Sequence, residues 1–529
     1  MPTLEWIGKE KVINHHQEVP FRVLDRQYSF DEDGQHAEDN GSENMIIHGD
    51  NLEALKALLP RYEGRVKCIY IDPPYNTGNE NWVYNDNVND PKIKKWLGEV
   101  VGKEGEDLTR HDKWLCMMYP RLKLLQKLLA KDGAIFISID DVEFYNLRLI
   151  CNEVFGEHNF IATIIWRKNY APKSTAKHFS EDHDYILVFG KNSDNWIPRK
   201  MPRTEKQNKA YKNLDNDPRG LWRPNNLAAR NYYSKGTYSI KCPGGRIIEG
   251  PPSGSYWRVS EEKFRELDRD GRIWWGKDGN NVPAPKIFLS EVSDGIVPQT
   301  FWSYEEVGHT QDAKKEIKAI FGGDMPFDTP KPVRLIERIL QIASDPDSII
   351  LDSFAGSGTT AHAVLNMNKA DGGNRKFILV EMMDYADSIT AERVRRVIRG
   401  YGEGKNAVEG TGGSFSYYEL GEPLLIGENL NEAVAPEKIR EYIWFMETKT
   451  PYTPAAGDNP YYLGKHNDTG YYFYYEPQQI TVLDYDFLAA VTEKAGGTVI
   501  YADRCSIDDD KLSQMGIVFK KIPRDISRL

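Results

Sequence analysis

The stretch MIIHGDNLEALKALLPRYEGRVKCIYIDPPY, residues 45–75, sets out a strand, a helix and a second strand in succession. Its first apolar run, MIIH, is followed by Gly49 and Asp50, and leucines then recur on one face of a predicted helix. The run VKCIYI comes next without polar alternation, which is typical of a strand buried on both faces. This order of elements predicts a parallel sheet with helical crossovers.

The same scheme returns further along the chain. Residues 114–141, WLCMMYPRLKLLQKLLAKDGAIFISIDD, predict an amphipathic helix that stops at Asp132-Gly133 and a buried strand, AIFISI. Residues 332–344 predict another helix. The stretch SIILDSFAGSGTTAHAV predicts a strand, a turn and a helix, and KFILVEM predicts a further strand. Beyond residue 403, alternating strand and helix patterns predict a small α/β domain at the end of the chain. The fold class is therefore α/β, with a mostly parallel sheet.

The region from 161 to 300 differs in character, because it is rich in turns and aromatic residues and has little helical periodicity. We expect it to be an inserted module. The whole chain carries a net charge of −11, yet residues 161–250 hold 17 Lys and Arg against 8 Asp and Glu. Such a local excess of positive charge suits contact with a polyanion. Aromatic residues lie among these charges, each with core packing as its alternative role: Trp166, Tyr170, Tyr211, Trp222, Tyr232, Tyr233 and Tyr238.

Length and composition limit the classes of protein to consider. A chain of 529 residues predicts two or three domains, and no apolar run is long enough to cross a bilayer. The N-terminus lacks the pattern of a secretory signal, so we expect a cytoplasmic protein without membrane association. The five cysteines are scattered singly, and His15-His16 has no second cluster nearby, so no metal site is expected.

A glycine-rich turn, LDSFAGSGTTAHAV at residues 351–364, joins a predicted strand to a helix. Gly356 and Gly358 let a ligand approach the backbone, and the helix offers free N–H groups. Glu381 ends the next predicted strand, where an acidic side chain accepts hydrogen bonds from ribose hydroxyls. These features predict a nucleoside-cofactor pocket, and a purely structural tight turn is the alternative. The absence of GxxxxGK[ST] disfavours a phosphate loop of the Walker type.

The tetrapeptide Asp72-Pro73-Pro74-Tyr75 follows directly after a predicted strand. Prolines fix the backbone and lack an N–H, which leaves carbonyl oxygens in such a turn available to a ligand. A carboxylate, a carbonyl and an aromatic face together form a socket for a planar amine. The alternative is a proline-stiffened strand end with an ordinary surface tyrosine.

DPPY after an apolar strand, followed later by FAGSGTT, resembles the beta class of DNA amino-methyltransferases, which use S-adenosylmethionine. Longer stretches resemble the modification (Mod) subunits of type III restriction-modification systems: YIDPPYNTGNE with WVYND, KWLCMMYPRLKLLQKLLAKDGAIFISIDD and TPKPVRLIERIL. The resemblance runs from about residue 44 to 400. It implies a Rossmann-like methyltransferase fold with an inserted target-recognition module. The implied domains are 1–43, 44–160, 161–300, 301–402 and 403–529.

The same resemblance implies roles for individual residues. Asp72, Pro73, Pro74 and Tyr75 are the implied catalytic tetrapeptide, which grasps the N6 amino group of an adenine flipped out of duplex DNA. Glu381 is implied to hold the cofactor ribose, and Asp50 to lie near its adenine. For Lys331, a solvent-exposed lysine at a helix start is the alternative. The remaining implied cofactor-binding residues are Asp328, Lys331, Pro332, Asp352, Phe354, Ala355, Gly356, Ser357, Gly358, Thr359 and Thr360.

Other readings remain open at this point. Cytosine-N4 methylation is one, although Asp72 at the first motif position is more usual in adenine enzymes and serine in the N4 group. RNA or protein-amide methylation is another, where asparagine more often stands first. A catalytically inactive DNA-binding scaffold is a third. The resemblance also implies duplex DNA, a second copy of the chain and a restriction subunit as partners, whereas the recognition sequence stays undetermined.

Overall fold

The structure is a computed structural model, and it describes residues 3–77, 95, 98, 110–292, 295–455 and 459–524. The chain divides into two compact units, one made of Met1–Pro198 and Gln299–Leu529 and the other of Arg199–Pro298. Each unit is described by itself. The stretch WVYND and the end of YIDPPYNTGNE lie outside the described residues.

The larger unit is built on an eleven-stranded sheet with the order β15-β6-β7-β5-β4-β16-β17-β3-β20-β1-β2. The strands from β5 to β20 in this order run parallel to one another, whereas β7 and β1 pair antiparallel with their neighbours. The predicted mixed, mostly parallel Rossmann-like sheet is confirmed. The strands are β1 (Arg22–Asp31), β2 (Gly34–His36), β3 (Met45–His48), β4 (Val66–Ile71), β5 (Leu129–Ile139), β6 (Phe160–Arg167), β7 (His183–Gly190), β15 (Phe301–Trp302), β16 (Ile349–Asp352), β17 (Lys376–Glu381) and β20 (Phe415–Pro423).

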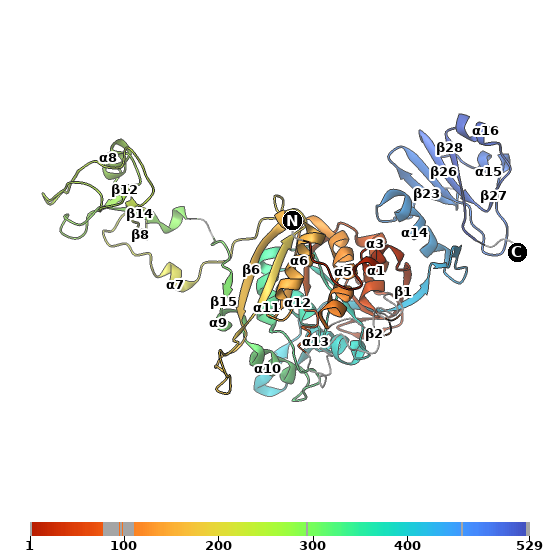
Figure 1. The fold of residues 1–529 in the computed structure, drawn as a ribbon, viewed down its shortest axis with the longest axis horizontal. Coiled ribbons are helices and arrows are strands. Elements are labelled where there is room, and N and C mark those ends of the chain that lie inside the picture. The colour runs from red at the N-terminus through yellow and green to blue at the C-terminus, as the bar shows by residue number, and fades with distance from the viewer. Residues whose placement is uncertain are drawn as a thin grey trace. The chain divides into compact units, whose positions relative to one another are not determined.

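Two groups of helices pack on this sheet (Figure 1). The first group is α3 (Asn51–Tyr62), α5 (Arg110–Leu128) and α6 (Phe144–Phe155), and the second is α11 (Val333–Ala343), α12 (Thr359–Asp371) and α13 (Glu392–Arg399). Ile69 and Ile71 of β4 join a core cluster with the first group, whereas Cys68 and Tyr70 are buried outside that cluster. Successive strand side chains point to opposite faces, so β4 is covered on both, as its unbroken apolar run predicts.

The start of β5 differs from the sequence expectation. The helix α5 ends at Leu128 and the strand begins at Leu129, so Asp132-Gly133 lies within the strand and the predicted stop there is wrong. A shift in register between Val66 and Cys68 of the neighbouring strand accommodates the extra residues. A side chain at position 133 would meet the backbone oxygens of β4 at 2.9 Å, which requires glycine.

The region expected as an insertion contributes to both units. Its first part forms β6 and β7 of the central sheet, and the compact unit Arg199–Pro298 holds a small core around Trp257 and Phe264. This unit is made of short elements: α7 (Glu205–Asn208), β8 (Trp222–Pro224), β9 (Ala228–Ala229), β10 (Ile240–Lys241), β11 (Ile247–Ile248), β12 (Tyr256–Trp257), α8 (Glu261–Arg269), β13 (Ile273–Trp274) and β14 (Ala284–Phe288).

The end of the chain forms the strand, helix and strand succession that its sequence predicts. A four-stranded sheet has the order β23-β24-β26-β28, with bounds Tyr462–His466, Thr469–Phe473, Gly497–Ala502 and Ile517–Lys521. The helices α14 (Pro436–Thr448), α15 (Tyr485–Ala489) and α16 (Asp509–Gln514) accompany it. Tyr471, Tyr472 and Phe473 are buried, so this part of the aromatic run TGYYFYYEP is a packed strand. Within the described ranges, no helix combines the length and apolar character needed to cross a bilayer.

Candidate active site

Three strand ends bring the predicted site residues together. Asp72 follows β4, the glycine turn follows β16, and Glu381 ends β17. These three strands are parallel neighbours in the order β4-β16-β17, so their carboxyl ends lie side by side at one edge of the sheet. Ligands of open α/β sheets bind at this edge.

Trp114 of α5 fixes the backbone of the tetrapeptide. The fully buried Trp114 indole donates a hydrogen bond of 2.7 Å to the Pro74 carbonyl. In the described part of the chain, no residue donates a hydrogen bond to the Pro73 carbonyl. Of the two proline carbonyls, Pro74 therefore serves the fold, and the contact of the Pro73 carbonyl with a ligand stays a prediction.

Lys331 lies against the tetrapeptide. Its ammonium forms an ion pair with the Asp72 carboxylate and lies 5.1 Å from the centre of the Tyr75 ring. The Lys331 side chain is 13% exposed, so the alternative of a solvent-exposed helix-start lysine is wrong. Burial raises the pKa of the Tyr75 hydroxyl well above its usual value, and the nearby Asp72 carboxylate raises it further. The hydroxyl therefore stays protonated and the side chain neutral.

The glycine turn requires its glycines. Gly356 and Gly358 have φ angles of 52° and 78°, in the left-handed region that other residues rarely adopt. A Cβ atom at Gly356 would lie 3.1 Å from the Phe327 ring, and one at Gly358 would lie 3.0 Å from the Thr390 carbonyl oxygen. The turn is thus both strained for other residues and closely packed.

Two buried carboxyl groups hold the turn. Asp352 accepts hydrogen bonds from the Thr360 hydroxyl at 2.6 Å and from the Phe354 N–H at 3.0 Å. Glu381 accepts from the Gly356 N–H at 2.8 Å. Burial raises the pKa of both Asp352 and Glu381 to about 7, because desolvation penalises the charged form more than these hydrogen bonds favour it.

Two adjoining pockets open at this edge. The smaller, of about 30 Å³, lies at the glycine turn, and the larger, of about 440 Å³, lies at the tetrapeptide. Both are lined by Asp72 and Lys331, so the two predicted motifs share one continuous site. The predicted residues that line one or both pockets are Asp72, Pro73, Tyr75, Lys331, Asp352, Phe354, Ala355, Gly356, Ser357, Thr359 and Thr360.

The other predicted residues lie around these pockets rather than on their walls. Asp328 precedes the pocket-lining Thr329, and Pro332 is the N-cap of α11. Asp50 caps α3 by accepting from the Leu52 N–H at 2.8 Å, and it pairs with Arg121 of α5. Asp50 therefore has a clear structural role, and its contact with a cofactor adenine stays a prediction.

The larger pocket also contains residues that the sequence did not predict. Lys168, which follows β6, and Asp184, at the start of β7, both line it. Asp184 precedes the apolar run YILVFG, which marks a strand but not its neighbours. The antiparallel pairing of β6 and β7 that places these residues beside the tetrapeptide was not visible in the sequence.

The aromatic residues of the basic region divide into two sets. Trp166, Tyr211 and Trp222 are buried, which is the core-packing role, and Trp166 also lines the larger pocket. Tyr170 and Tyr232 are 64% and 77% exposed. Tyr233 is at the border of exposure and Tyr238 is half-buried. Contact of the exposed tyrosines with DNA stays a prediction.

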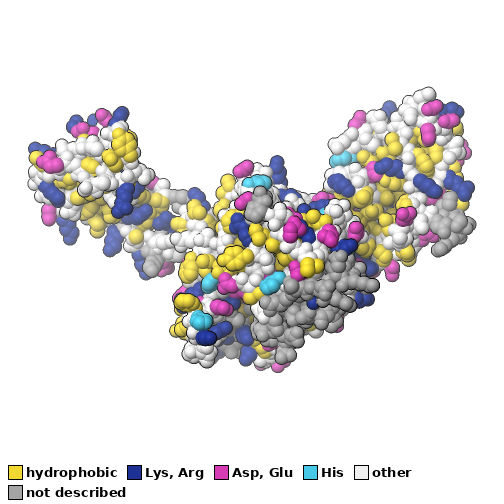
Figure 2. Space-filling model, viewed as in Figure 1, with side chains coloured by type: hydrophobic (Ala, Val, Ile, Leu, Met, Phe, Trp, Pro, Cys, Tyr) yellow, Lys and Arg dark blue, Asp and Glu magenta, His cyan; other side chains and the backbone are white. Residues whose placement is uncertain are grey.

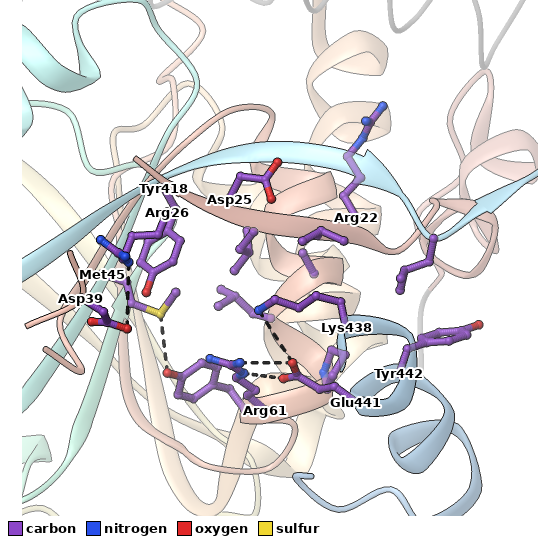
Figure 3. A pocket seen from close by; sticks show the side chains of 17 residues that line it. Arg22, Asp25, Arg26, Asp39, Met45, Arg61, Tyr418, Lys438, Glu441 and Tyr442 are labelled. Atoms are coloured by element: carbon purple, nitrogen blue, oxygen red, sulfur yellow. Dashed lines mark hydrogen bonds and ion pairs between the residues drawn. The ribbon is translucent and has the colours of Figure 1, made fainter. Parts of the chain in front are cut away.

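A further pocket of about 320 Å³ lies between α3, β1 and α14 (Figure 3). Arg61 forms a two-bond ion pair with Glu441, and Lys438 lies 4.0 Å from the same carboxylate. Arg26 and Asp39 form another pair at 3.9 Å. Each of these three cations thus faces a carboxylate, and none of the predicted site residues lines the pocket.

Residues 66–392 match the model of the family N6_N4_Mtase, described as DNA methylase. The chain belongs to this DNA methylase family. The match contains the tetrapeptide, both site-lining strands β6 and β7, and the glycine turn.

Individual relatives agree with this membership. The chain is 36% identical to the type III restriction-modification enzyme StyLTI Mod subunit of Salmonella typhimurium, over 68% of the chain and 58% of that protein. It is 32% identical to the EcoPI Mod subunit of Escherichia phage P1, over 72% and 63%. It is 31% identical to the type II methyltransferase M.KpnI of Klebsiella pneumoniae, over 65% and 81%. The predicted resemblance to type III Mod subunits is confirmed, and the matched part spans about three fifths of the two Mod subunits.

Proposed function

We propose that this chain transfers a methyl group from S-adenosylmethionine to the N6 amino group of adenine in duplex DNA, as part of a restriction-modification system. The observation that carries this proposal is the shared site, in which the Asp72 turn and the glycine turn line adjoining pockets. Membership of the DNA methylase family and similarity to proteins named as Mod subunits support it.

The glycine turn suits a nucleoside cofactor that carries positive charge. Asp352 and Glu381 are buried carboxyl groups beside a turn whose glycines leave no room for side chains. When bound, S-adenosylmethionine supplies an electrophilic methyl group on a sulfonium. We propose that Asp352 and the 354–360 turn hold its methionine part, that Glu381 holds its ribose, and that Asp328, Lys331 and Pro332 border it, with Asp50 near its adenine.

The tetrapeptide carries the groups that the target amine needs in order to react. An aryl amine is a poor nucleophile because its lone pair is delocalised into the ring. We propose that the Asp72 carboxylate and the Pro73 carbonyl accept the two N6 hydrogens, which localises the lone pair and stabilises the positive charge that develops on nitrogen. Trp114 keeps the Pro74 carbonyl occupied and thereby fixes the orientation of the turn.

The target amine lies inside the base stack of a duplex, so the nucleotide has to be flipped into the larger pocket. There the Tyr75 ring replaces part of the lost stacking. The unit Arg199–Pro298 carries 19 Lys and Arg against 12 Asp and Glu, and basic side chains are numerous on the face drawn in Figure 2. We assign this unit to duplex contact. The proposed partners are a second copy of this chain and a restriction subunit.

The test is the sequencing of plasmid DNA from cells with and without this protein. N6-methyladenine at one sequence context, absent with Asp72→Ala, supports the proposal and gives the recognition site. Detection of N4-methylcytosine in place of N6-methyladenine would show that cytosine is the target base. Unmodified DNA, from a protein that still binds duplex in vitro, would favour the inactive scaffold.

A further inference from the structure

The larger pocket contains a lysine and an aspartate that neither the tetrapeptide nor the glycine turn accounts for. Lys168 follows β6 directly, and Asp184 is the second residue of β7. Asp184 pairs in register with Trp166 of β6, so the ladder fixes both residues at the same end of these strands. The Lys168 ammonium donates a hydrogen bond of 2.5 Å to the Asp184 carboxylate.

The pair sits where a ligand is expected, not on the surface. The side chain of Asp184 is 4% exposed and that of Lys168 is 26% exposed, and both line the pocket with Asp72, Pro73 and Tyr75. Burial raises the pKa of Asp184, and Lys168 opposes this shift as the nearest cation. A buried ion pair is a weak source of stability, so its position in this pocket calls for another explanation.

The ammonium of Lys168 has donors left to offer. It carries three N–H groups, and within the described part of the chain Asp184 is the acceptor of one of them. The lysine stem is flexible, and the rigid strand β7 presents the carboxylate that holds its end in place. Lys168 is thus a hydrogen-bond donor aimed by Asp184 within the site of the tetrapeptide.

Adenine offers acceptors on both sides of its amino group, N1 on one side and N7 on the other. Cytosine has an acceptor beside its amino group only at N3, with a C–H on the opposite side. A donor on the N7 side of the amino group therefore orients an adenine ring and contributes to its selection. A donor on the N1 side orients the ring without excluding cytosine, whose N3 lies in the corresponding position. An aspartate and a backbone carbonyl at the amino group cannot distinguish the two bases.

We propose that Lys168 donates a hydrogen bond to a ring nitrogen, N1 or N7, of the flipped adenine, and that Asp184 positions Lys168 for this contact. The inference rests on the proposed function and adds a base-binding residue to it. Lys168 touches the substrate in this account, whereas Asp184 acts through Lys168.

Deaza analogues test the contact atom by atom. Duplexes carry adenine, 1-deazaadenine or 7-deazaadenine at the target position, and single-turnover methyl transfer is measured for the wild type, Lys168→Met and Asp184→Asn. A hydrogen bond to a charged donor is worth about 1.5–3 kcal/mol, so the wild type should lose roughly 10- to 100-fold in rate with one of the two analogues. Lys168→Met should methylate adenine more slowly than the wild type by a similar factor. Replacing adenine with that analogue should slow this variant little further, because the two changes remove the same bond.

The controls separate this role from others. Lys173→Met removes another lysine of the same pocket and should leave the analogue effect intact. Asp184→Asn should reduce the analogue effect without abolishing it, and Lys168→Arg should restore part of it. Cofactor binding should stay the same in every variant, which shows that the fold is kept.

The outcomes are distinguishable. No transfer to adenine by the wild type would overturn the proposed function and this inference with it. Transfer that is insensitive to both analogues in the wild type would overturn this inference alone. An equal loss by Lys168→Met on all three duplexes, with a weaker dependence of binding on salt, would assign Lys168 to a DNA phosphate instead.

Discussion

Replacing Asp352 with asparagine removes one ionisable group from the glycine turn, and we expect it to change how the free energy of unfolding depends on pH. Asp352 is 3% exposed, and its burial raises the pKa from 3.8 to about 7. An asparagine side chain has the same shape and keeps an oxygen that accepts hydrogen bonds. The substitution therefore tests charge with little change in packing.

The sign and size follow from proton linkage. Between about pH 4 and pH 7 the carboxyl is protonated in the folded protein and ionised in the unfolded chain, so unfolding releases a proton. The stability from this group is complete below its unfolded pKa and is lost as pH rises through about 7. One pKa unit corresponds to about 1.4 kcal/mol, which gives a total on the order of 4 kcal/mol and about 2 kcal/mol between pH 5.5 and 7.

The assay compares urea unfolding of the wild type and Asp352→Asn at pH 5.5, 7 and 8. The wild type should lose about 2 kcal/mol more than the variant between the first two values. The infrared band of protonated carboxylic acids should weaken in the variant at pH 5.5. Asp347→Asn, which changes an exposed carboxylate shortly before β16, is the matched control. Parallel pH profiles for the wild type and Asp352→Asn would show that the pKa of Asp352 is not raised in the folded protein.

Three further substitutions test other parts of the site. Gly358→Ala forces a φ of 78° on a residue with a Cβ and brings that atom to 3.0 Å from the Thr390 carbonyl oxygen. We expect the free energy of unfolding to fall by at least the roughly 1–2 kcal/mol of left-handed strain, which calorimetry should show as a lower melting temperature, and cofactor binding to weaken. Trp114→Phe leaves the Pro74 carbonyl without its buried donor, at a cost of about 1–3 kcal/mol, and should slow methyl transfer while the cofactor Kd in titration calorimetry stays near that of the wild type. Lys331→Met removes the ion pair of the tetrapeptide carboxylate, and we expect about a tenfold lower single-turnover rate; an unchanged rate would leave Lys331 with a structural role only.

The sheet was predictable where its strands are unbroken apolar runs. VKCIYI and KFILVE form β4 and β17, and both are buried as two-sided strands of a parallel sheet should be. The strand Arg22–Asp31 was not predicted, because its alternation of polar and apolar residues is weak and β20, the partner that joins it to the central sheet, lies almost 400 residues away. Local pattern carries no information on such distant pairing.

The same distinction applies to the site. Asp72 and Gly356 were predictable as neighbours because each follows the carboxyl end of a buried strand, and these ends meet at one edge. Lys168 and Asp184 were not, since their place depends on β6 and β7 joining that sheet in antiparallel order. Trp114 was missed for another reason: nothing in its own helix signals that the indole reaches the Pro74 carbonyl.

The most direct test of the central claim is transfer of a labelled methyl group from S-adenosylmethionine to duplex DNA that contains the recognised site, by the wild type and by Asp72→Ala. We expect label on adenine N6 with the wild type and none with Asp72→Ala, although the variant still binds the cofactor. Equal labelling by both proteins, or none by a wild type that binds both cofactor and DNA, would contradict it.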